Sequence, residues 1–252
     1  MSKYCTNPEI ELEQVSEDTI IVRFADEINP RWPLVIREFK KRVLKRWKSG
    51  IIDWVSSYAS VMLQYDLLRL PLEEEIETLR QLASAVVVSD IVEKANTTKV
   101  LPICFDESFA LDLGELCRSA RKTSGEWKEI YLGNEYVVYA FGFKPGFPYM
   151  GEIDEAIASS RHAEPRQMVP QGSVGIADRQ TGVYPDDSPG GWNIIGNCPL
   201  KMWEVEKIPS SLLQAGDCVK WVEIDLDMHR EITERGMEYW KDWFRKEGIE
   251  SC

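Results

Sequence analysis

The sequence predicts an α+β protein of two domains, an α+β domain over residues 1–99 and a β-barrel domain over residues 100–252. Strand-like and helical patterns alternate along roughly the first hundred residues. From Glu135 to Pro199, glycine and proline interrupt short strand-like stretches, and after Asp225 the pattern becomes helical. With 252 residues, 44% of them hydrophobic, the chain can bury the core that each of two modest domains requires.

The predicted N-terminal domain begins with a strand at Thr19–Phe24, which is rich in β-branched residues. A helix follows, because Pro30 and Pro33 suit its first turn and apolar residues recur at helical spacing until Gly50. Two strands, a second helix that begins near Pro71 and a closing strand complete the series; the three strands are predicted at Ile51–Ser57, Ser60–Tyr65 and Val100–Phe105. This order of strands and helices is typical of a ferredoxin-like domain.

The second domain is predicted to begin with two short connector helices between Leu111 and Leu132, separated near Ser124. Short strands with tight turns follow, which favours a closed or partly closed β-barrel. These strands are predicted at Tyr136–Phe141, Ser173–Ala177, Gly182–Tyr184, Trp192–Ile195, Leu200–Val205 and Cys218–Ile224. A terminal helix carries an apolar stripe that we expect to pack on a surface; the stripe consists of Ile232, Trp240, Trp243 and Phe244.

Charge and hydropathy exclude several classes of partner. A formal net charge of -12 repels nucleic acid and anionic membrane surfaces, whereas a few local cations can still bind a small anionic substrate. The segment Tyr4–Glu13 lacks the apolar core of a signal peptide, and the longest apolar runs are too short to span a bilayer. We therefore expect a cytoplasmic protein that binds neither nucleic acid nor membrane.

Several catalytic and metal-binding patterns are missing. The six cysteines have no CxxC spacing and there are two histidines, so no metal site is expected and the thiols are predicted to be reduced. Ser173 is not expected to be a nucleophile, because a GxSxG elbow needs glycine where Gln171 stands. The GxxxxGK[ST] phosphate loop is absent, so any ATP would bind at an unconventional site or on another chain.

The segment from Gly142 to Tyr149 predicts a tight turn beside a cation. Pro145 and Gly146 suit the central positions of a type II turn, and Lys144 is held extended by the proline that follows it. The ammonium group of Lys144 either meets a carboxylate or points to water, and the residue type alone favours water.

A second cationic cluster lies at Arg161, His162 and Arg166, and it predicts an anion site because arginine binds carboxylate or phosphate with two parallel hydrogen bonds. The alternative is that these arginines pair with Glu164 and other acids to hold a loop. His162 as a general acid or base requires a geometry that the sequence does not define. Farther along, Gln180 and Thr181 offer uncharged polar groups for amide or phosphate oxygens, although turn chemistry explains the glycines around them equally well.

Three motifs together resemble the family that contains the B-type subunit of 5-oxoprolinase, allophanate hydrolase subunit 1 and the histidine-kinase inhibitor KipI. These motifs are GFKPGFPYMG, RHAEPRQMVPQGSVGIADRQTGVYP and SPGGWNIIGNCP, and they lie between Glu135 and Pro199. The resemblance implies a cyclophilin-like β-barrel behind a small α+β domain. It further implies one subunit of an ATP-dependent 5-oxoprolinase that works with A-type and C-type partner subunits, and is inactive alone.

In that complex, Arg161 and Arg166 would hold a carboxylate or phosphoryl group, while Lys144, Gln180 and Thr181 would polarise the amide of a small anionic substrate. The resemblance carries over no catalytic residue. The alternatives that it leaves open are a KipI-like kinase inhibitor and a subunit of an allophanate or urea system. The chain departs from the family pattern at Tyr131, Gln171 and Asn197, where His, Ala and Arg are usual.

Overall fold

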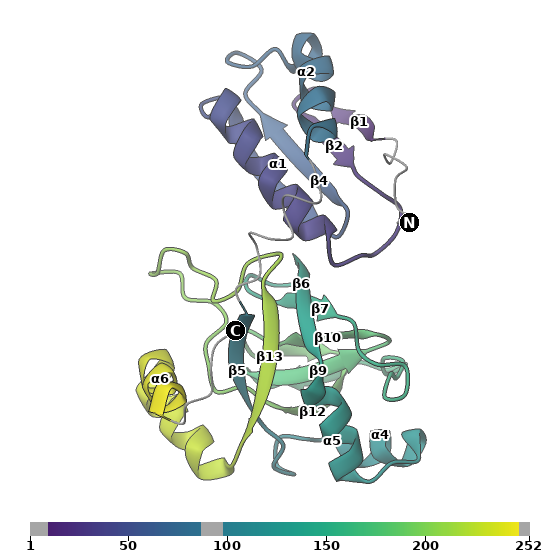
Figure 1. The fold of residues 1–252 in the computed structure, drawn as a ribbon, viewed down its shortest axis with the longest axis vertical. Helices are drawn as coiled ribbons and strands as arrows, with labels where there is room; N and C mark the ends of the chain where they lie inside the picture. The colour runs from purple at the N-terminus through teal and green to yellow at the C-terminus, as the bar shows by residue number, and fades with distance from the viewer. Residues whose placement is uncertain (1–9, 87–97, 247–252) are drawn as a thin grey trace, which may run out of the picture. The chain divides into compact units, whose positions relative to one another are not determined.

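The computed structural model describes residues 10–86 and 98–246 of the chain (Figure 1). The chain divides into two compact units, the first ending at Asn96 and the second beginning at Thr97. Each unit has a hydrophobic core of its own. Within the described residues, no helix is long and apolar enough to cross a membrane.

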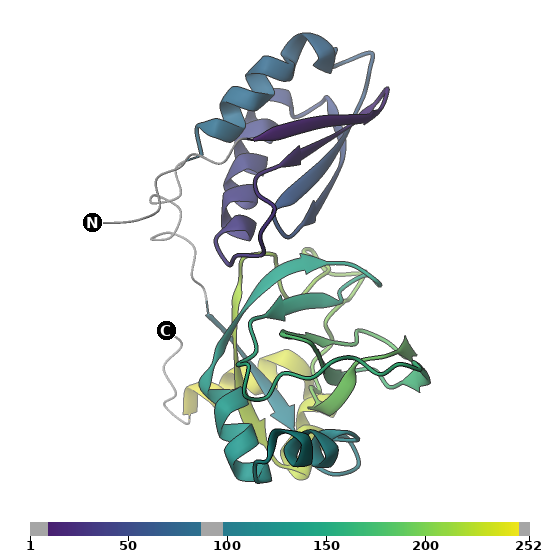
Figure 2. The ribbon, with the colours of Figure 1, turned by 90° about the vertical axis from the view of Figure 1, so that its right-hand side faces the viewer.

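In its described residues, the first unit is a four-stranded antiparallel sheet with the two helices on one face, as Figure 2 shows. The elements in chain order are β1 (Glu11–Ser16), β2 (Thr19–Arg23), α1 (Trp32–Trp47), β3 (Ile51–Ser57), β4 (Ser60–Tyr65) and α2 (Leu72–Ser84). The strand order in the sheet is β1-β2-β4-β3. The predicted apolar stripe of α1 is confirmed at its centre, where Phe39 and Val43 are fully buried against the sheet.

The strand predicted at Val100–Phe105 is present, but its assignment to the first domain as the closing strand is wrong. Its place beside β2 is occupied by β1, which a short turn joins to β2, with Ser16 opposite Thr19. The predicted strand instead forms β5 (Thr98–Cys104) of the second unit, where it runs parallel to β13 (Cys218–Ile224). A turn of two residues brings β1 to β2 at little entropic cost, whereas the predicted strand lies more than seventy residues from β2 in sequence.

The second unit is a closed barrel of seven strands in the order β10-β7-β6-β13-β5-β12-β9. The remaining barrel strands are β6 (Glu135–Phe141), β7 (Pro148–Gly151), β9 (Ser173–Ala177), β10 (Gln180–Val183) and β12 (Asn193–Asn197). The prediction of a barrel is confirmed, and its cyclophilin-like character stays a prediction. The strand expected at Leu200–Val205 is wrong, because only Trp203 forms a bridge there, to Ser211.

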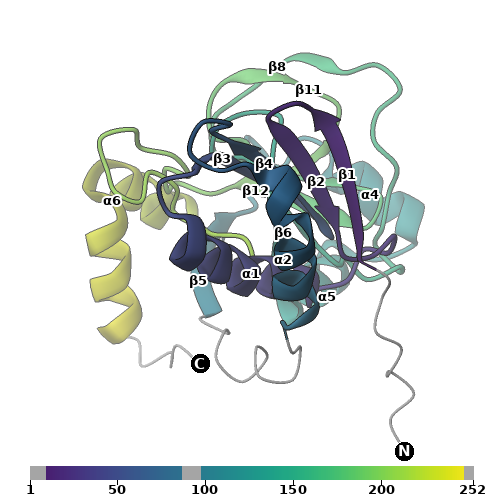
Figure 3. The same ribbon diagram turned by 90° about the horizontal axis from the view of Figure 1, so that it is seen from above.

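Helices and a small outer sheet complete the described part of the second unit. The connector helices are confirmed as α4 (Leu113–Ala120) and α5 (Ser124–Gly133), and α6 (Leu226–Lys246) packs on the barrel through Trp240, whose Nε1 donates to Val100 O. Outside the barrel, β8 (Arg166–Val169) pairs antiparallel with β11 (Ser188–Gly190), and Figure 3 shows the two strands side by side. This outer sheet carries the cationic segment that the sequence singled out.

Candidate functional site

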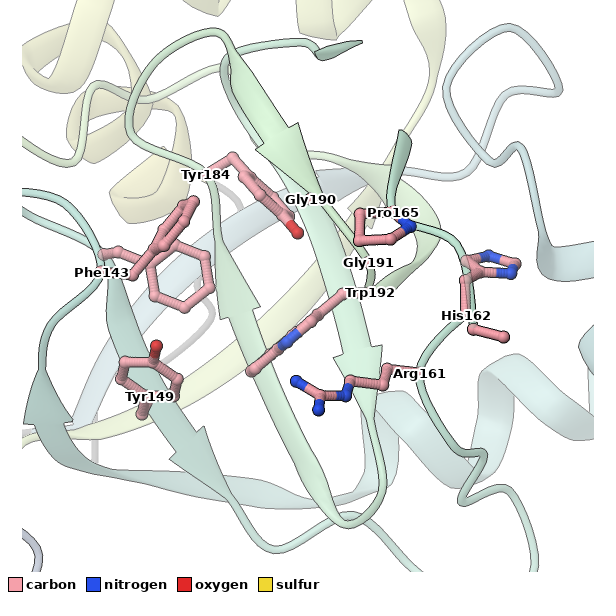
Figure 4. A pocket seen from close by; sticks show the side chains of 11 residues that line it. Phe143, Tyr149, Arg161, His162, Pro165, Tyr184, Gly190, Gly191 and Trp192 are labelled. Carbon is pink, nitrogen blue, oxygen red and sulfur yellow. The ribbon is translucent and has the colours of Figure 1, made fainter. Parts of the chain in front are cut away.

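A pocket of about 500 Å³ lies between the barrel and the outer sheet (Figure 4). Aromatic side chains form one wall, and the backbone of Gly190 and Gly191 together with Arg161 and His162 forms another. The aromatic residues are Phe143, Phe147, Tyr149, Tyr184 and Trp192. A pocket that combines aromatic walls with a few polar groups is a usual form of a small-molecule site.

The aromatic wall is packed edge to face. The ring of Phe147 lies 5.4 Å from that of Trp192 and 5.2 Å from that of Tyr184, both nearly perpendicular to it. Tyr149 lies 5.8 Å from Trp192, and Phe143, with 60% of its surface exposed, packs on Phe147 at 5.6 Å. Such edge-to-face contacts hold the rings in fixed orientations. The wall is therefore a preformed apolar surface for a small ring.

Turn geometry brings Phe143 and Phe147 to this wall. Phe147 N donates to Lys144 O, and Gly146 has a φ of +84°, so the predicted type II turn at Pro145-Gly146 is confirmed. A Cβ atom at Gly146 would also lie 2.6 Å from Trp203 Cβ, so glycine is required there for space as well as for conformation.

Gly190 shapes the opposite wall. A Cβ atom on this residue would overlap the hydroxyl of Tyr184, which is itself buried. Burial raises the pKa of Tyr184, so its phenol remains protonated and neutral at physiological pH. The glycine therefore allows a neutral hydroxyl to lie directly against the outer sheet beneath the pocket.

Arg161 supplies the positive charge of the pocket. Figure 4 shows its guanidinium extending toward Trp192, whereas the ring of His162 turns away from the aromatic wall. Among residues 10–86 and 98–246, no ion pair or hydrogen bond occupies the Arg161 side chain. An unpaired guanidinium beside an apolar wall suits a ligand with a carboxylate or phosphate group.

Arg166 and His162 are instead directed at Asp112, a buried carboxylate at the start of α4. Arg166 Nη2 donates to Asp112 Oδ1 at 2.5 Å, and His162 Nε2 lies 3.4 Å from Asp112 Oδ2. Arg166 therefore pairs with an acid and holds its loop, as the alternative prediction stated. The acid is Asp112 rather than Glu164. The expected role of Arg166 as a direct anion ligand has no support in this geometry.

Lys144 is paired as well. Its Nζ donates to Asp186 Oδ1 at 2.7 Å and to Asp187 O at 3.2 Å, which ties the turn of the β6–β7 hairpin to the chain before β11. The residue type favoured an ammonium group that points to water, and this prediction is wrong. The alternative, that the ammonium group of Lys144 meets a carboxylate, is confirmed. Lys144 does not line the pocket.

Gln180 and Thr181 lie on β10 and do not line the pocket either. Thr181 is fully buried in the barrel, where its Oγ1 is 2.8 Å from the hydroxyl of Tyr131 and donates to Gly175 O. Tyr131, one of the departures from the family pattern, is therefore a core residue whose hydroxyl is satisfied internally.

The other two departures meet at a second, larger cavity of about 910 Å³ between the barrel and α6. There Asn197 Nδ2 donates to Gln171 O, and Asn197 Oδ1 lies 2.8 Å from His229 Nε2. Because the amide oxygen only accepts, His229 Nε2 must carry the hydrogen. Burial, with a smaller contribution from the charge of Arg230, lowers the pKa of His229 and favours its neutral form.

Asp112 is the residue beside the pocket that sequence reasoning missed. It precedes α4, which is the position of an ordinary helix cap, yet its carboxylate makes no capping bond and instead accepts from Ile194 N and Arg166. The aromatic wall was also missed, although four of its five residues lie within the motifs GFKPGFPYMG and SPGGWNIIGNCP. Within the described part of the chain, no cluster of acids, histidines and cysteines could hold a metal ion.

Known structures share this architecture. TTHA0988 superposes with a TM-score of 0.71 and 28% identity over 82% of this chain, which spans only 40% of TTHA0988. Urea amidolyase from K. lactis superposes with a TM-score of 0.70 over 91% of this chain and 16% of its own, at 16% identity, which indicates a shared fold.

The sequence comparisons identify the family. Residues 10–213 match the family model described as carboxyltransferase domain, subdomain C and D. The B-type subunit of 5-oxoprolinase from Bacillus subtilis (strain 168) is 33% identical over 228 residues, which is 87% of this chain and 95% of that protein. The chain belongs to the family of the carboxyltransferase domain, subdomain C and D.

Proposed function

We propose that this chain is the B-type subunit of an ATP-dependent 5-oxoprolinase, which opens 5-oxo-L-proline to L-glutamate together with A-type and C-type subunits. The sequence relationship to the B-type subunit of the Bacillus subtilis 5-oxoprolinase supports this proposal. The single structural observation that carries it is Arg161, a guanidinium beside an aromatic wall that has no partner within the described part of the chain.

The pocket matches the two chemical features of 5-oxoproline. The flat, uncharged lactam ring packs against Trp192 and Tyr149, and the carboxylate binds the guanidinium of Arg161. A pocket of about 500 Å³ is ample for a ring of this size, which leaves room for a group from a partner subunit.

The partner subunits account for the rest of the chemistry. Ring opening adds water across the C–N bond of a stable amide, and phosphorylation of the amide oxygen by ATP would make the carbon electrophilic. This chain has no GxxxxGK[ST] loop to hold the phosphates, so we assign ATP binding to a partner. The role of this chain is to bind and orient the lactam acid.

Reconstitution tests this proposal. The purified chain is expected to lack 5-oxoprolinase activity and to gain it when it is assembled with A-type and C-type subunits, with glutamate and ADP as the measured products. Arg161→Ala should lower kcat/KM of the complex about a hundredfold, and Arg161→Lys about tenfold, because lysine keeps the charge but loses the planar fork.

The matched control is Arg118→Ala, which removes an exposed arginine of α4 that bonds only within its own helix. This variant should retain wild-type activity. Full ATP-dependent activity of the isolated chain would refute the subunit assignment, and normal turnover of both Arg161 variants would remove Arg161 from the site.

A second candidate, a subunit of a urea or allophanate system, is favoured by the shared fold with urea amidolyase. Allophanate also combines a planar amide with a carboxylate, so Arg161 would bind it in the same way. The reconstituted complex distinguishes the two candidates, because turnover of allophanate but not of 5-oxoproline would select the second.

A further inference from the structure

Asp112 joins three elements around the pocket. It lies at the start of α4 with 6% of its surface exposed, and Ile194 N of β12 donates to its Oδ2 at 2.6 Å. Its own N–H donates to Ile194 O at 2.9 Å, so the residue is fixed to the barrel on both its main chain and its side chain. A carboxylate held by a backbone N–H in a buried position is a rigid attachment point.

The cationic segment 161–166 is attached to this point through the side chain of Arg166. Arg166 Nη2 binds Asp112 Oδ1, and Arg166 Nη1 is buried without a hydrogen-bond partner among the described residues. Asp112 therefore anchors the Arg166 side chain. His162 Nε2 lies 3.4 Å from Asp112 Oδ2, while His162 N donates to Gly191 O at 2.7 Å.

We propose that Asp112 is a positioning residue, which holds the 161–166 segment so that the adjacent Arg161 presents an unpaired guanidinium to the carboxylate of the ligand. The choice of ligand rests on the proposed function, whereas the anchoring does not. Asp112 acts in two ways. It holds the side chain of Arg166 at the end of the segment, and its two oxygens accept hydrogen bonds from Ile194 N and Arg166 rather than from Arg161.

Fixing Arg161 before the ligand arrives has an energetic consequence. An arginine on a loosely held loop loses backbone and side-chain freedom when it binds, and this loss subtracts from the affinity. Asp112→Asn keeps an oxygen for Ile194 N but loses the charge that holds Arg166. Its expected effect is therefore a looser segment in an otherwise intact barrel.

Hydrogen exchange of the ligand-free, full-length chain tests the anchoring. In Asp112→Asn, amides of residues 161–169 should exchange about tenfold faster than in the wild type, while those of β9 stay unchanged. The control is Asp217→Asn, which removes another buried carboxylate that accepts a backbone N–H, from Gln214 at 3.0 Å. This control should leave residues 161–169 unchanged, and an equal response of both variants would overturn the anchoring.

Calorimetric binding of 5-oxo-L-proline tests the action through Arg161. Asp112→Asn should weaken the Kd about tenfold in the wild-type background and leave it unchanged in the Arg161→Ala background, because the two residues act on the same contact. An equal weakening in both backgrounds would overturn the proposal. If the wild-type chain binds no 5-oxoproline, the proposed function fails, and the exchange experiment still decides whether Asp112 anchors the segment.

Discussion

Two polar clusters in the second unit differ in how completely they satisfy their own hydrogen bonds. In the barrel interior, the hydroxyls of Tyr131, Tyr136 and Thr181 each have a partner within the cluster or on a neighbouring carbonyl. Beside the pocket, Asp112 accepts a hydrogen bond from Arg166, whereas Arg161, which lines the pocket, has no partner among residues 10–86 and 98–246. Both clusters combine residues of the stretch from Glu135 to Pro199 with a residue in or next to a connector helix.

This difference distinguishes polar groups that stabilise the fold from a polar group that is available to a ligand. A buried hydroxyl that lacks a partner costs free energy, so the interior cluster is complete and contributes to stability. A guanidinium at a pocket can remain solvated until a ligand arrives, so its lack of a partner costs little and leaves it available. Of the polar groups predicted as one site, Thr181 therefore contributes to stability, whereas Arg161 is available to a ligand.

The largest expected effect is at the pocket. Gly190→Ala places a Cβ atom against the hydroxyl of Tyr184, so either the aromatic wall or the outer sheet must shift. We expect ligand affinity to fall about a hundredfold, since displacements of about 1 Å can have effects of this size. Calorimetry with 5-oxo-L-proline measures the change.

Gly191→Ala is the matched control, because a Cβ atom there meets its nearest neighbour, His162 O, at an ordinary 3.6 Å. Its loss of affinity should be much smaller. Equal losses in the two variants would show that the Tyr184 contact does not shape the pocket.

A smaller effect is expected in the barrel interior. Thr181→Val removes the hydroxyl that bonds both Tyr131 and Gly175 O, and the free energy of unfolding should fall by about 1 to 3 kcal/mol. Ligand affinity should not change, since Thr181 lies outside the pocket lining. Urea denaturation and calorimetry on the same protein check both statements.

Thr181→Ser keeps the hydroxyl and should recover most of the stability. A loss of ligand affinity in Thr181→Val at unchanged stability would contradict the comparison, because it would place the interior cluster in the binding site.

The smallest effect concerns His229, whose pKa is lowered mainly by burial. At pH values well above the ordinary histidine pKa of about 6.5, this residue is neutral in both the folded and the unfolded chain. As the pH falls below that value, the unfolded chain gains a proton before the folded chain does, so the free energy of unfolding decreases.

His229→Gln, which can still donate to Asn197 Oδ1, should weaken this dependence between about pH 8 and pH 5. Denaturation curves across that range measure it. An identical pH dependence in the variant would exclude His229 as the cause.

Local sequence signals predicted the features that adjacent residues determine. Pro145-Gly146 specifies its type II turn because proline fixes one dihedral angle and glycine tolerates the positive φ of the next position. The β-branched and aromatic residues of Tyr136–Phe141 predict a strand for a similar local reason. The same signals failed for Val100–Phe105, where the strand itself was predicted correctly but its sheet was not, because a short apolar run carries no information about the partner strand.

The sequence by itself determined an α+β chain with a barrel, a cationic segment near residue 161 and a resemblance to one family. Only the tertiary structure decided which cation is available to a ligand. Asp112 lies 54 residues before Arg166 in the chain, and barrel closure brings it within hydrogen-bond distance of that arginine. Whether a charge is paired depends on contacts between distant segments, and so the choice of Arg161 over Arg166 follows from the fold.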